Sequence, residues 1–507
     1  MKKTALIIII LTIFTKIIGF SREIVLSYFY GASTISDAYL ISLTIPQTIF
    51  AFIGIAIGTG YIPIFNEVEN LKGKQESDLF TNNLISALIL ISTIVVSLGF
   101  IFAGPLVKLF ASGFNGDTLS LATHFTRISI FAVYFSSLTY IFSARLQILN
   151  NFHASVLMGI PLNIVIIASI IISSNNKPIV LAYGFILASF SQMVFLYVNL
   201  KRKSFKYRFV LNLQDGSLKK FIYLAIPVIA GVSVNQINVL VDRTIASKIT
   251  VGGITALNYA NRLNLFIQAV FVMSIATIFY PTITRMVVEK NFDNLKKLLQ
   301  ETVNVILLLV LPITVGTIIF SQNIVFVLFG RGAFDIKAIS LTSAALLFYS
   351  IGMLGFGLRE ILSRVFYAMQ DTKTPTINAA IGMIINILLN IVLSKYMGIG
   401  GLALATSIAA TITTILLFFS LRNKIGSFGM KKISVSFVKI LLASIVMGGI
   451  AKLSFKFFTT SLSQNFSLLL AIGVGAVTYF VIIYFMKIED VDVMVSAIKK
   501  KFERKVV

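Results

Sequence analysis

Residues 19–41 read GFSREIVLSYFYGASTISDAYLI, a stretch that places Arg22, Glu23 and Asp37 among apolar side chains. The whole chain is strongly apolar, since 57% of its 507 residues are hydrophobic and 12% are charged, against about 25% charged in soluble domains. This composition predicts an all-α polytopic membrane protein. Charges inside a membrane span are costly, so the charges of this stretch need a reason.

Windows of about 20 apolar residues, the length that crosses about 30 Å of hydrocarbon, predict 14 transmembrane helices. They cover approximately 5–30, 35–65, 82–106, 121–148, 155–174, 178–200, 220–247, 253–285, 297–321, 337–367, 375–396, 400–421, 434–458 and 465–487. We expect the first range to stay as a helix, because no small-residue cleavage site follows it. An even number of spans places both termini on one side.

The formal charge of +24 is distributed unevenly between the predicted loops. Basic clusters occupy the start and 201–208, 219–220, 285–297, 431–432 and 499–505, whereas 31–36, 249–254 and 398–400 carry no Lys or Arg. This is the positive-inside pattern, which predicts a bacterial cytoplasmic membrane protein with both termini in the cytoplasm. The positive charge is therefore expected to attract anionic membrane lipids, and no nucleic acid partner is expected.

Three pairs of segments resemble each other at an offset of about 220 residues. DAY at 37–39 lies opposite LNY at 257–259, TGYIPIF at 59–65 opposite TIFYPTI at 277–283, and 144–155 opposite 363–375. An offset of six helices keeps the orientation, so we predict a parallel repeat of two six-helix bundles. The predicted parts are an N-terminal bundle (1–200), a basic cytoplasmic linker (201–219), a C-terminal bundle (220–422), transmembrane helices 13 and 14 (423–490) and a basic cytoplasmic tail (491–507).

Counting along the helices places several charges inside the membrane. If the first helix begins near Thr4, Lys16 lies about 18 Å and Arg22 about 27 Å from the cytoplasmic edge, while Arg262 lies about 10 Å below the outer edge. Glu23 is seven residues after Lys16 and shares its helix face. These depths indicate polar groups in the outer half of equivalent elements of the two bundles.

The depths favour a hydrated cationic cavity between the bundles, built for an anionic substrate. Arginine suits a diphosphate because its planar fork forms bidentate hydrogen bonds. Asp37 and Glu23 are expected to orient the arginines or to contact polar sugar and peptide groups. The alternative is that these charges pair with one another or extend to the outer interface.

No substrate-binding role is expected for the other charged residues and histidines of the spans. Five charged residues near span ends are expected to extend to the interface, namely Arg127, Arg145, Arg359, Glu360 and Arg364. His124 and His153 have no metal-ligand spacing. Cysteine is absent, which excludes disulfides and thiolate sites, and no cluster of acids indicates an enzyme.

A second polar set belongs to the predicted C-terminal bundle. Its members are Asp242, Asn386, Asn390 and Thr406, whose carboxylate, amide and hydroxyl oxygens suit a hard monovalent cation such as sodium. The alternative is a set of interhelical hydrogen bonds.

The opening stretch and four later segments resemble the MurJ (MviN) family of the multidrug/oligosaccharidyl-lipid/polysaccharide exporter superfamily. The later segments are ALNYANRLN at 256–264, ATIFYPTITR at 276–285, LQILNNFHASVLMGIPLNI at 146–164 and AMQDTKTP at 368–375. The resemblance runs from the first predicted helix to the fourteenth. It implies a flippase that moves lipid II, the undecaprenyl-diphosphate-linked peptidoglycan precursor, to the outer leaflet by alternating access, for cell-wall synthesis and without covalent chemistry.

The resemblance also implies roles for particular residues. Arg22 and Arg262 match the family's cavity arginines, Asp37 a nearby acid and Lys16 a basic position of the first helix. The family's sodium ligands match Asp242, Asn386, Asn390, the Leu402 carbonyl and Thr406. The last two helices are implied to form a groove for the lipid tail, and the cell-wall synthesis machinery is an implied partner.

This chain departs from the family pattern at two places. Phe50 and Ala51 stand where many members carry an arginine pair, and Lys16 or Arg243 are candidate substitutes. Asn390 stands where the family has an acid, which lowers the charge of the sodium site.

Four other functions are alternatives to the flippase. Two are transporters of the same superfamily, one for another undecaprenyl-linked oligosaccharide and one a drug/cation antiporter, whose cavity should present acids in place of Arg22 and Arg262. The others are a membrane enzyme acting on polyprenyl phosphates, which would need an acidic metal-binding cluster, and a scaffold that does not transport.

Overall fold

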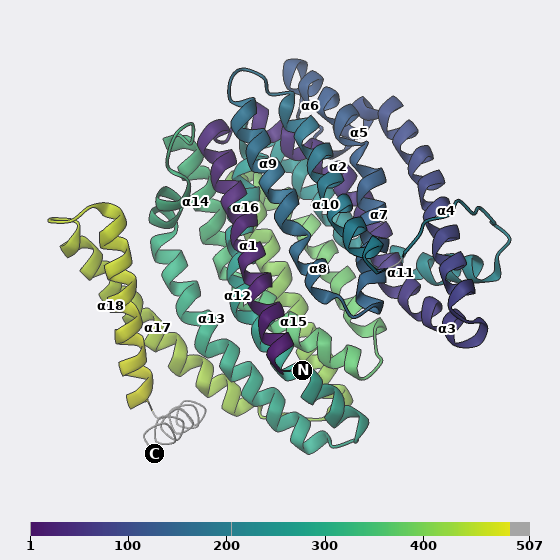
Figure 1. The fold of residues 1–507 in the computed structure, drawn as a ribbon. Coiled ribbons are helices and arrows are strands. Elements are labelled where there is room, and N and C mark those ends of the chain that lie inside the picture. The colour runs from purple at the N-terminus through teal and green to yellow at the C-terminus, as the bar shows by residue number, and fades with distance from the viewer. Residues whose placement is uncertain (1, 204, 487–507) are drawn as a thin grey trace. The chain divides into compact units, whose positions relative to one another are not determined.

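The computed structural model describes residues 2–203 and 205–486, and the regular elements of this part are all helices (Figure 1). The predicted basic tail at 491–507 and the end of the fourteenth predicted span lie outside the described residues. The described chain divides into two compact units, Met1–Ala256 with Phe329–Ala338, and Leu257–Leu328 with Ile339–Val507. Each unit is described by itself.

The first unit contains η1, a short π-helix, and eleven α-helices. They are α1 (Lys2–Tyr30), α2 (Thr34–Ala56), η1 (Ile57–Tyr61), α3 (Ile62–Lys72), α4 (Lys74–Ile101), α5 (Ala103–Phe110), α6 (Gly116–Ser129), α7 (Ala132–Ile148), α8 (Phe152–Leu157), α9 (Gly159–Ser173), α10 (Val180–Lys201) and α11 (Gly216–Ile249).

The other seven helices belong mainly to the second unit. They are α12 (Gly253–Val288), α13 (Phe292–Phe329), α14 (Ile336–Ile351), α15 (Met353–Ala368), α16 (Lys373–Ile425), α17 (Met430–Phe458) and α18 (Gln464–Phe485). The first residues of α12 and α14 and the last residue of α13 fall in the first unit.

Each predicted span overlaps a helix or a bent pair of helices. By length and composition, nine helices of the described residues can cross a membrane, or up to twelve if each bent pair is one span. The ranges 375–396 and 400–421 both lie in α16, which breaks at Gly398 (φ 56°, ψ −132°), and 5–30 corresponds to α1. The prediction of an all-α protein with many spans is confirmed, whereas the number 14 stays a prediction.

Buried aromatic and aliphatic side chains of α2, η1, α3, α4, α7 and α10 form the core of the first unit. Tyr61 is fully buried, and its hydroxyl lies 2.9 Å from that of Thr81. Arg145 is 4% exposed, forms a salt bridge with Asp78 of α4, and lies 4.0 Å from the ring centroid of Phe65. The expectation that Arg145 extends to the interface is therefore wrong, because an acid and a ring from other helices hold it in the core.

Helix α11 groups with the first unit. It packs against α2, and the hydroxyl of Thr244 donates to the carbonyl of Leu109 at 2.8 Å, while the amide of Gly113 donates to the hydroxyl of Ser247 at 3.0 Å. The compact units are defined by contacts, whereas the predicted bundles are defined by a sequence repeat. The predicted bundle boundary at 201–219 therefore stays a prediction.

The core of the second unit joins α12, α13, α15, α16, α17 and α18. Close approach of its helices depends on small residues: a Cβ on Gly352 would lie 2.6 Å from the Cα of Ser407, and the Ser407 hydroxyl donates to the carbonyl of Phe348 at 2.6 Å. Small residues and hydroxyl bonds of this kind are the usual means of packing helices in membranes.

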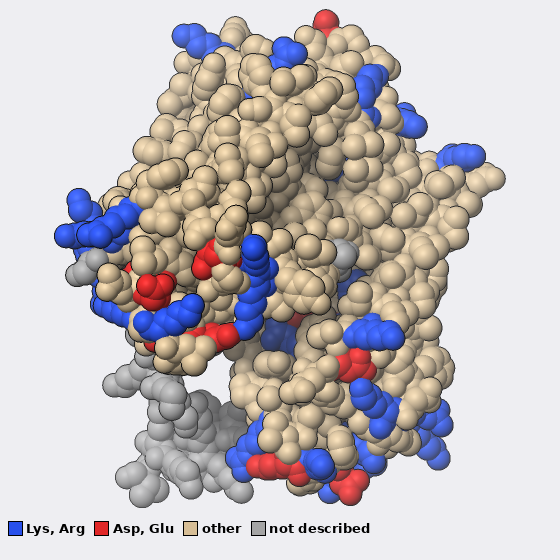
Figure 2. Space-filling model, turned by 90° about the vertical axis from the view of Figure 1, so that its right-hand side faces the viewer, with Lys and Arg blue, Asp and Glu red and all other residues tan. Residues whose placement is uncertain are grey.

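Charged side chains occupy limited parts of the visible surface. Figure 2 shows Lys and Arg gathered in patches, with broad areas that carry neither basic nor acidic side chains. Many large hydrophobic residues of the described chain are exposed, among them Ile10, Phe14, Leu187 and Phe480. Such a surface suits contact with lipid.

Candidate functional site

Arg22 and Glu23 form an ion pair on α1. The distance from Arg22 Nη2 to Glu23 Oε1 is 2.6 Å, and the two side chains are 20% and 4% exposed. The carboxylate is therefore buried, while the guanidinium keeps access to its surroundings. Lys16, two turns earlier on the same helix, is exposed. This pair fits an orienting role of Glu23 and equally the alternative that these charges pair with one another, so the role of Glu23 stays a prediction.

Asp37 has a use that the sequence did not reveal. Its side chain is 1% exposed and accepts hydrogen bonds from the amide of Gly252 at 2.7 Å and from the amide and hydroxyl of Thr255 at 2.8 and 2.6 Å. Gly252 and Thr255 flank the start of α12, where amide groups lack partners within the helix. Asp37 of α2 thus caps α12, and a contact with substrate stays a prediction.

Backbone segments pack closely around this cap. Gly31, Gly252 and Gly332 have φ of 57°, 80° and 64°, in the left-handed region. A Cβ on Gly31 would lie 2.2 Å from the carbonyl oxygen of Ala333, and the amide of Ala333 donates to the carbonyl of Tyr28 at 2.8 Å. Only glycine fits such contacts, so the turn after α1 and the segment 331–333 are held together by main-chain contacts.

Arg262 lies on α12 in the second unit, where it is exposed. Two residues later Asn264 is buried, and its side-chain oxygen accepts a hydrogen bond from Gln268 at 3.3 Å. Arg22, Glu23 and Asp37 belong to the first unit, so the assembly of all predicted substrate residues around one cavity stays a prediction.

Four members of the predicted sodium set lie on α16. The Asn390 amide donates to the side-chain oxygen of Asn386 at 2.8 Å, Asn386 donates to the hydroxyl of Thr406 at 3.1 Å, and Thr406 donates to the Leu402 carbonyl at 2.9 Å. We call these four residues the α16 amide chain. It joins the two arms of α16 across the break at Gly398. Asp242 lies on α11 in the first unit and is half-buried.

The α16 amide chain offers the oxygen types that sodium prefers, and its four residues are uncharged. Three of its oxygens already accept hydrogen bonds from within the chain. Each of these oxygens has a second lone pair that a cation could use, and the charge of the cation would have to be balanced by a carboxylate from elsewhere.

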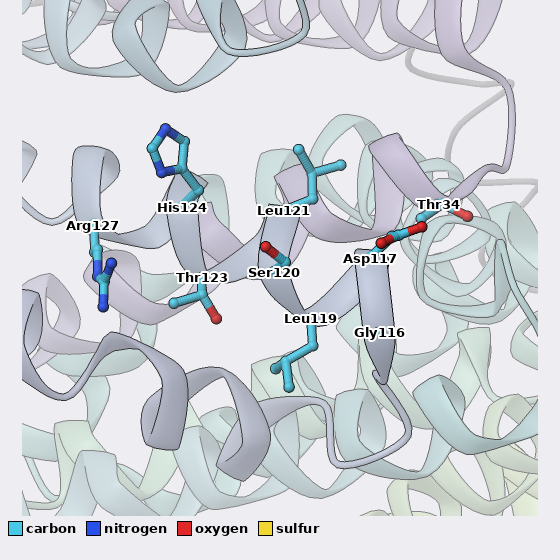
Figure 3. A pocket seen from close by; sticks show the side chains of 9 residues that line it. All are labelled: Thr34, Gly116, Asp117, Leu119, Ser120, Leu121, Thr123, His124 and Arg127. Carbon is cyan, nitrogen blue, oxygen red and sulfur yellow. The ribbon is translucent and has the colours of Figure 1, made fainter.

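A pocket of about 750 Å³ follows α6 beside Thr34 of α2 (Figure 3). The polar side chains Asp117, Ser120, His124 and Arg127 are exposed along one face of this helix, and Ala122 and Phe125 are buried on the other. This is the solvated face of an amphipathic helix. The expectation that His124 is incidental agrees with this position.

A second cavity is an apolar groove between α13, α17 and α18 in the second unit. Its volume is about 650 Å³, and Gly316, Gly448 and Gly475 line it together with aliphatic and aromatic residues. The hydroxyl of Tyr479 donates to the carbonyl of Leu308 at 2.6 Å, so no hydroxyl donor of this residue is left to the groove. The sequence analysis predicts none of these lining residues, although a glycine in each of three apolar helices is a signal of close packing.

The fold is similar to that of a class of solved membrane transporters. A solved structure described as an inward-facing multidrug resistance MATE family transporter of the MOP superfamily superimposes with a TM-score of 0.71 at 14% identity, covering 82% of this chain and 96% of that chain. At this identity the likeness concerns the fold alone, which is that of the multidrug/oligosaccharidyl-lipid/polysaccharide exporters.

The family follows from closer matches. The family model described as lipid II flippase MurJ matches residues 26–473, and the chain therefore belongs to the MurJ family. A probable lipid II flippase MurJ of Buchnera aphidicola is 30% identical over 82% of this chain and 82% of its own length. A solved structure described as lipid II flippase MurJ in an inward closed conformation has a TM-score of 0.83 at 28% identity, covering 95% of this chain and 98% of that chain.

Proposed function

We propose that this chain is a flippase that moves lipid II from the inner to the outer leaflet of the bacterial cytoplasmic membrane by alternating access. Membership of the MurJ family supports this function, and the observation that carries it is the presence of Arg22 and Arg262 within predicted spans. A guanidinium inside the membrane is costly unless it meets water or an anion. Besides the carboxylate of Glu23, which pairs with Arg22, a lipid diphosphate can accept bidentate hydrogen bonds from such guanidinium groups.

In this proposal the protein performs no covalent chemistry. Both termini are cytoplasmic, in agreement with the positive-inside distribution of its loops. Lys16, Arg22 and Arg262 attract the diphosphate headgroup, Glu23 orients Arg22, and Asp37 sets the position of α12. Anionic membrane lipids would contact the basic cytoplasmic loops, and the cell-wall synthesis machinery is a candidate partner.

The apolar groove between α13, α17 and α18 suits the lipid tail. It is lined almost wholly by hydrocarbon, and its opening toward the surface of the second unit would let a polyprenyl chain stay in lipid while the headgroup crosses. Small residues at three lining positions leave room for that chain.

Sodium is a secondary part of the proposal. If it binds, Asn386, Asn390, Leu402 and Thr406 would hold it, with Asp242 as the charge that balances it. The ion would supply coupling of a gradient to the conformational cycle. Membrane potential is the alternative source of energy, at about 2.3 kcal/mol for each charge moved across 100 mV.

The test is complementation of a strain depleted of its own lipid II flippase. We expect growth with the wild-type chain and with Arg422→Ala, an exposed arginine at the end of α16, and loss of growth with Arg22→Ala and Arg262→Ala at equal membrane levels. Rescue by both cavity variants would contradict the role of these arginines. Failure of the wild-type chain, when it is present in the membrane, would favour another undecaprenyl-linked oligosaccharide.

A further inference from the structure

Helix α15 carries a polar stripe in the second unit. Its members recur at helical spacing and are half-buried or exposed, and they are Phe356, Arg359, Glu360, Ser363, Arg364 and Tyr367. The opposite face of the same helix is buried in the core through Leu358, Ile361, Leu362, Val365 and Phe366. Together with α14, this helix is long and apolar enough to form one bent span. We call this set the α15 stripe.

Arg359 lies within the span and not at its end. Helix α15 ends at Ala368, nine residues later, which corresponds to about 13 Å along the axis. The predicted span ends at 367 and α15 ends at Ala368, so the expectation that Arg359 extends to the interface stays a prediction. Arg364 lies one turn from that end, so the expectation suits this residue better.

The acid of the α15 stripe is engaged by Arg364. Glu360 Oε1 lies 2.8 Å from Arg364 Nε. Arg359 interacts electrostatically with the neighbouring Glu360, and its Cζ lies 5.5 Å from the ring centroid of Phe356. A guanidinium has five N–H donors, which a ring face cannot satisfy. A charged stripe on a span is tolerated where it faces water or an anion.

The α15 stripe lies beside the face of α12 that carries Arg262. Arg364 Nη2 lies 3.9 Å from the sulfur of Met273, and its Cζ lies 5.6 Å from the ring centroid of Tyr280. On a helix with 3.6 residues per turn, Met273 and Tyr280 point within about 20° of Arg262. Arg262 therefore lies on the same face of α12 as the residues that contact the α15 stripe. It is about 16 Å nearer the start of α12 than Met273.

We propose that the α15 stripe is an additional anion-binding site, in which Arg359 contacts a diphosphate before it reaches Arg262. The Glu360–Arg364 pair positions the stripe, and Phe356 supports the Arg359 guanidinium from one side. In the proposed topology this end of α15 is the cytoplasmic end, so the site is the first one that a headgroup meets. The lipid identity of the anion rests on the proposed function, whereas the preference for anions does not.

The absence of cysteine from the sequence allows a direct test. The Ser363→Cys variant places a single thiol in the α15 stripe, and its rates of modification by an anionic and a cationic methanethiosulfonate report the local potential. We expect Arg359→Gln on this background to lower the ratio of anionic to cationic rates about 5-fold, as for removal of one unit charge nearby. Arg359→Lys keeps the charge and should keep the ratio.

The matched control is Lys395→Gln, which removes an exposed positive charge of the same unit. Lys395 lies on α16 just before its break at Gly398. This substitution should leave the ratio unchanged. An unchanged ratio in Arg359→Gln, or no modification of the Ser363→Cys thiol by either reagent, would overturn the proposal.

Two ligands then separate the sources of the anion. Sodium pyrophosphate and lipid II in detergent should both slow modification of the Ser363→Cys variant, lipid II at a concentration at least about 10-fold lower because its tail adds apolar burial. Protection by pyrophosphate alone supports the anion site and contradicts the lipid identity, which separates this inference from the proposed function. Protection by neither ligand contradicts the site.

Discussion

The carboxylate of Asp37 accepts both the backbone amide and the hydroxyl of Thr255, 218 residues later in the sequence. A side chain of α2 thus completes the first turn of α12, the helix that carries Arg262. The position of that turn depends on one acid, because the amides at a helix start have no acceptor in their own helix.

We expect Asp37→Ala to expose the start of α12. Loss of the acceptor leaves two buried amides without a partner, at about 1–3 kcal/mol each. Hydrogen exchange followed by mass spectrometry should show at least about 10-fold faster exchange in peptides that contain Gly252 and Thr255. Asp117→Ala removes an exposed acid of the same unit and is the control. Equal protection of the two variants would contradict the capping role.

Filling the apolar groove should weaken lipid binding without disturbing the fold. A Cβ on Gly316 meets no atom within 4 Å, so Gly316→Leu places its side chain in the groove without a clash at Cβ. We expect its affinity for lipid II, measured by native mass spectrometry, to fall about 10-fold. Gly449→Leu, on an exposed face of α17 with the same open surroundings, should bind as the wild type does. The same loss in both variants would argue against the groove.

Asn390→Asp should strengthen sodium binding. A carboxylate restores a negative charge to the α16 amide chain, and hard cations prefer charged oxygen ligands. We measure heat resistance by size-exclusion chromatography after heating, in sodium chloride and in potassium chloride. We expect the gain in sodium over potassium to be larger for this variant than for the wild type. Asn378→Asp adds a charge to the same helix outside the amide chain and should show no such difference. An equal sodium response in wild type and Asn390→Asp would contradict a role for charge at this position.

Acid should weaken the connection between α15 and α16. Lys424 Nζ donates to Asp371 at 2.7 Å, and the amide of Thr374 adds a second bond, so these donors lower the pKa of Asp371 to about 2. The carboxylate's usual pKa is near 4. A lowered folded-state pKa stabilises the protein above the unfolded value, and this contribution is lost as pH falls from about 4 to about 2.

The heat resistance of Asp371→Asn should therefore be lower than that of the wild type at pH 7, and the difference should shrink between pH 4 and pH 2. Asp293→Asn removes an acid whose side chain is 94% exposed and should match the wild type throughout. A difference for Asp371→Asn that is constant with pH would show that its carboxylate does not act through ionisation.

The sequence predicted the helices well and the partners of polar residues poorly. Apolar run length located each span because the membrane thickness sets it. Nothing local paired Arg145 with Asp78, which lies 67 residues away, or Asp37 with Thr255. The helix that carries Arg359 ends at Ala368, one residue after the predicted span, but the position of Phe356 and Glu360 beside this arginine required the structure. Site residues were therefore predicted by type and depth, and their contacts required the fold.

The break at Gly398 changes what α16 can do mechanically. An unbroken helix turns as one rod, because its backbone hydrogen bonds continue from end to end. At Gly398 the backbone adopts torsions that only glycine accepts readily, so the helical geometry of α16 is interrupted between its two arms. The bond from Asn386 to Thr406 crosses the break. Rotation of one arm is thus passed to the other by two neutral side chains.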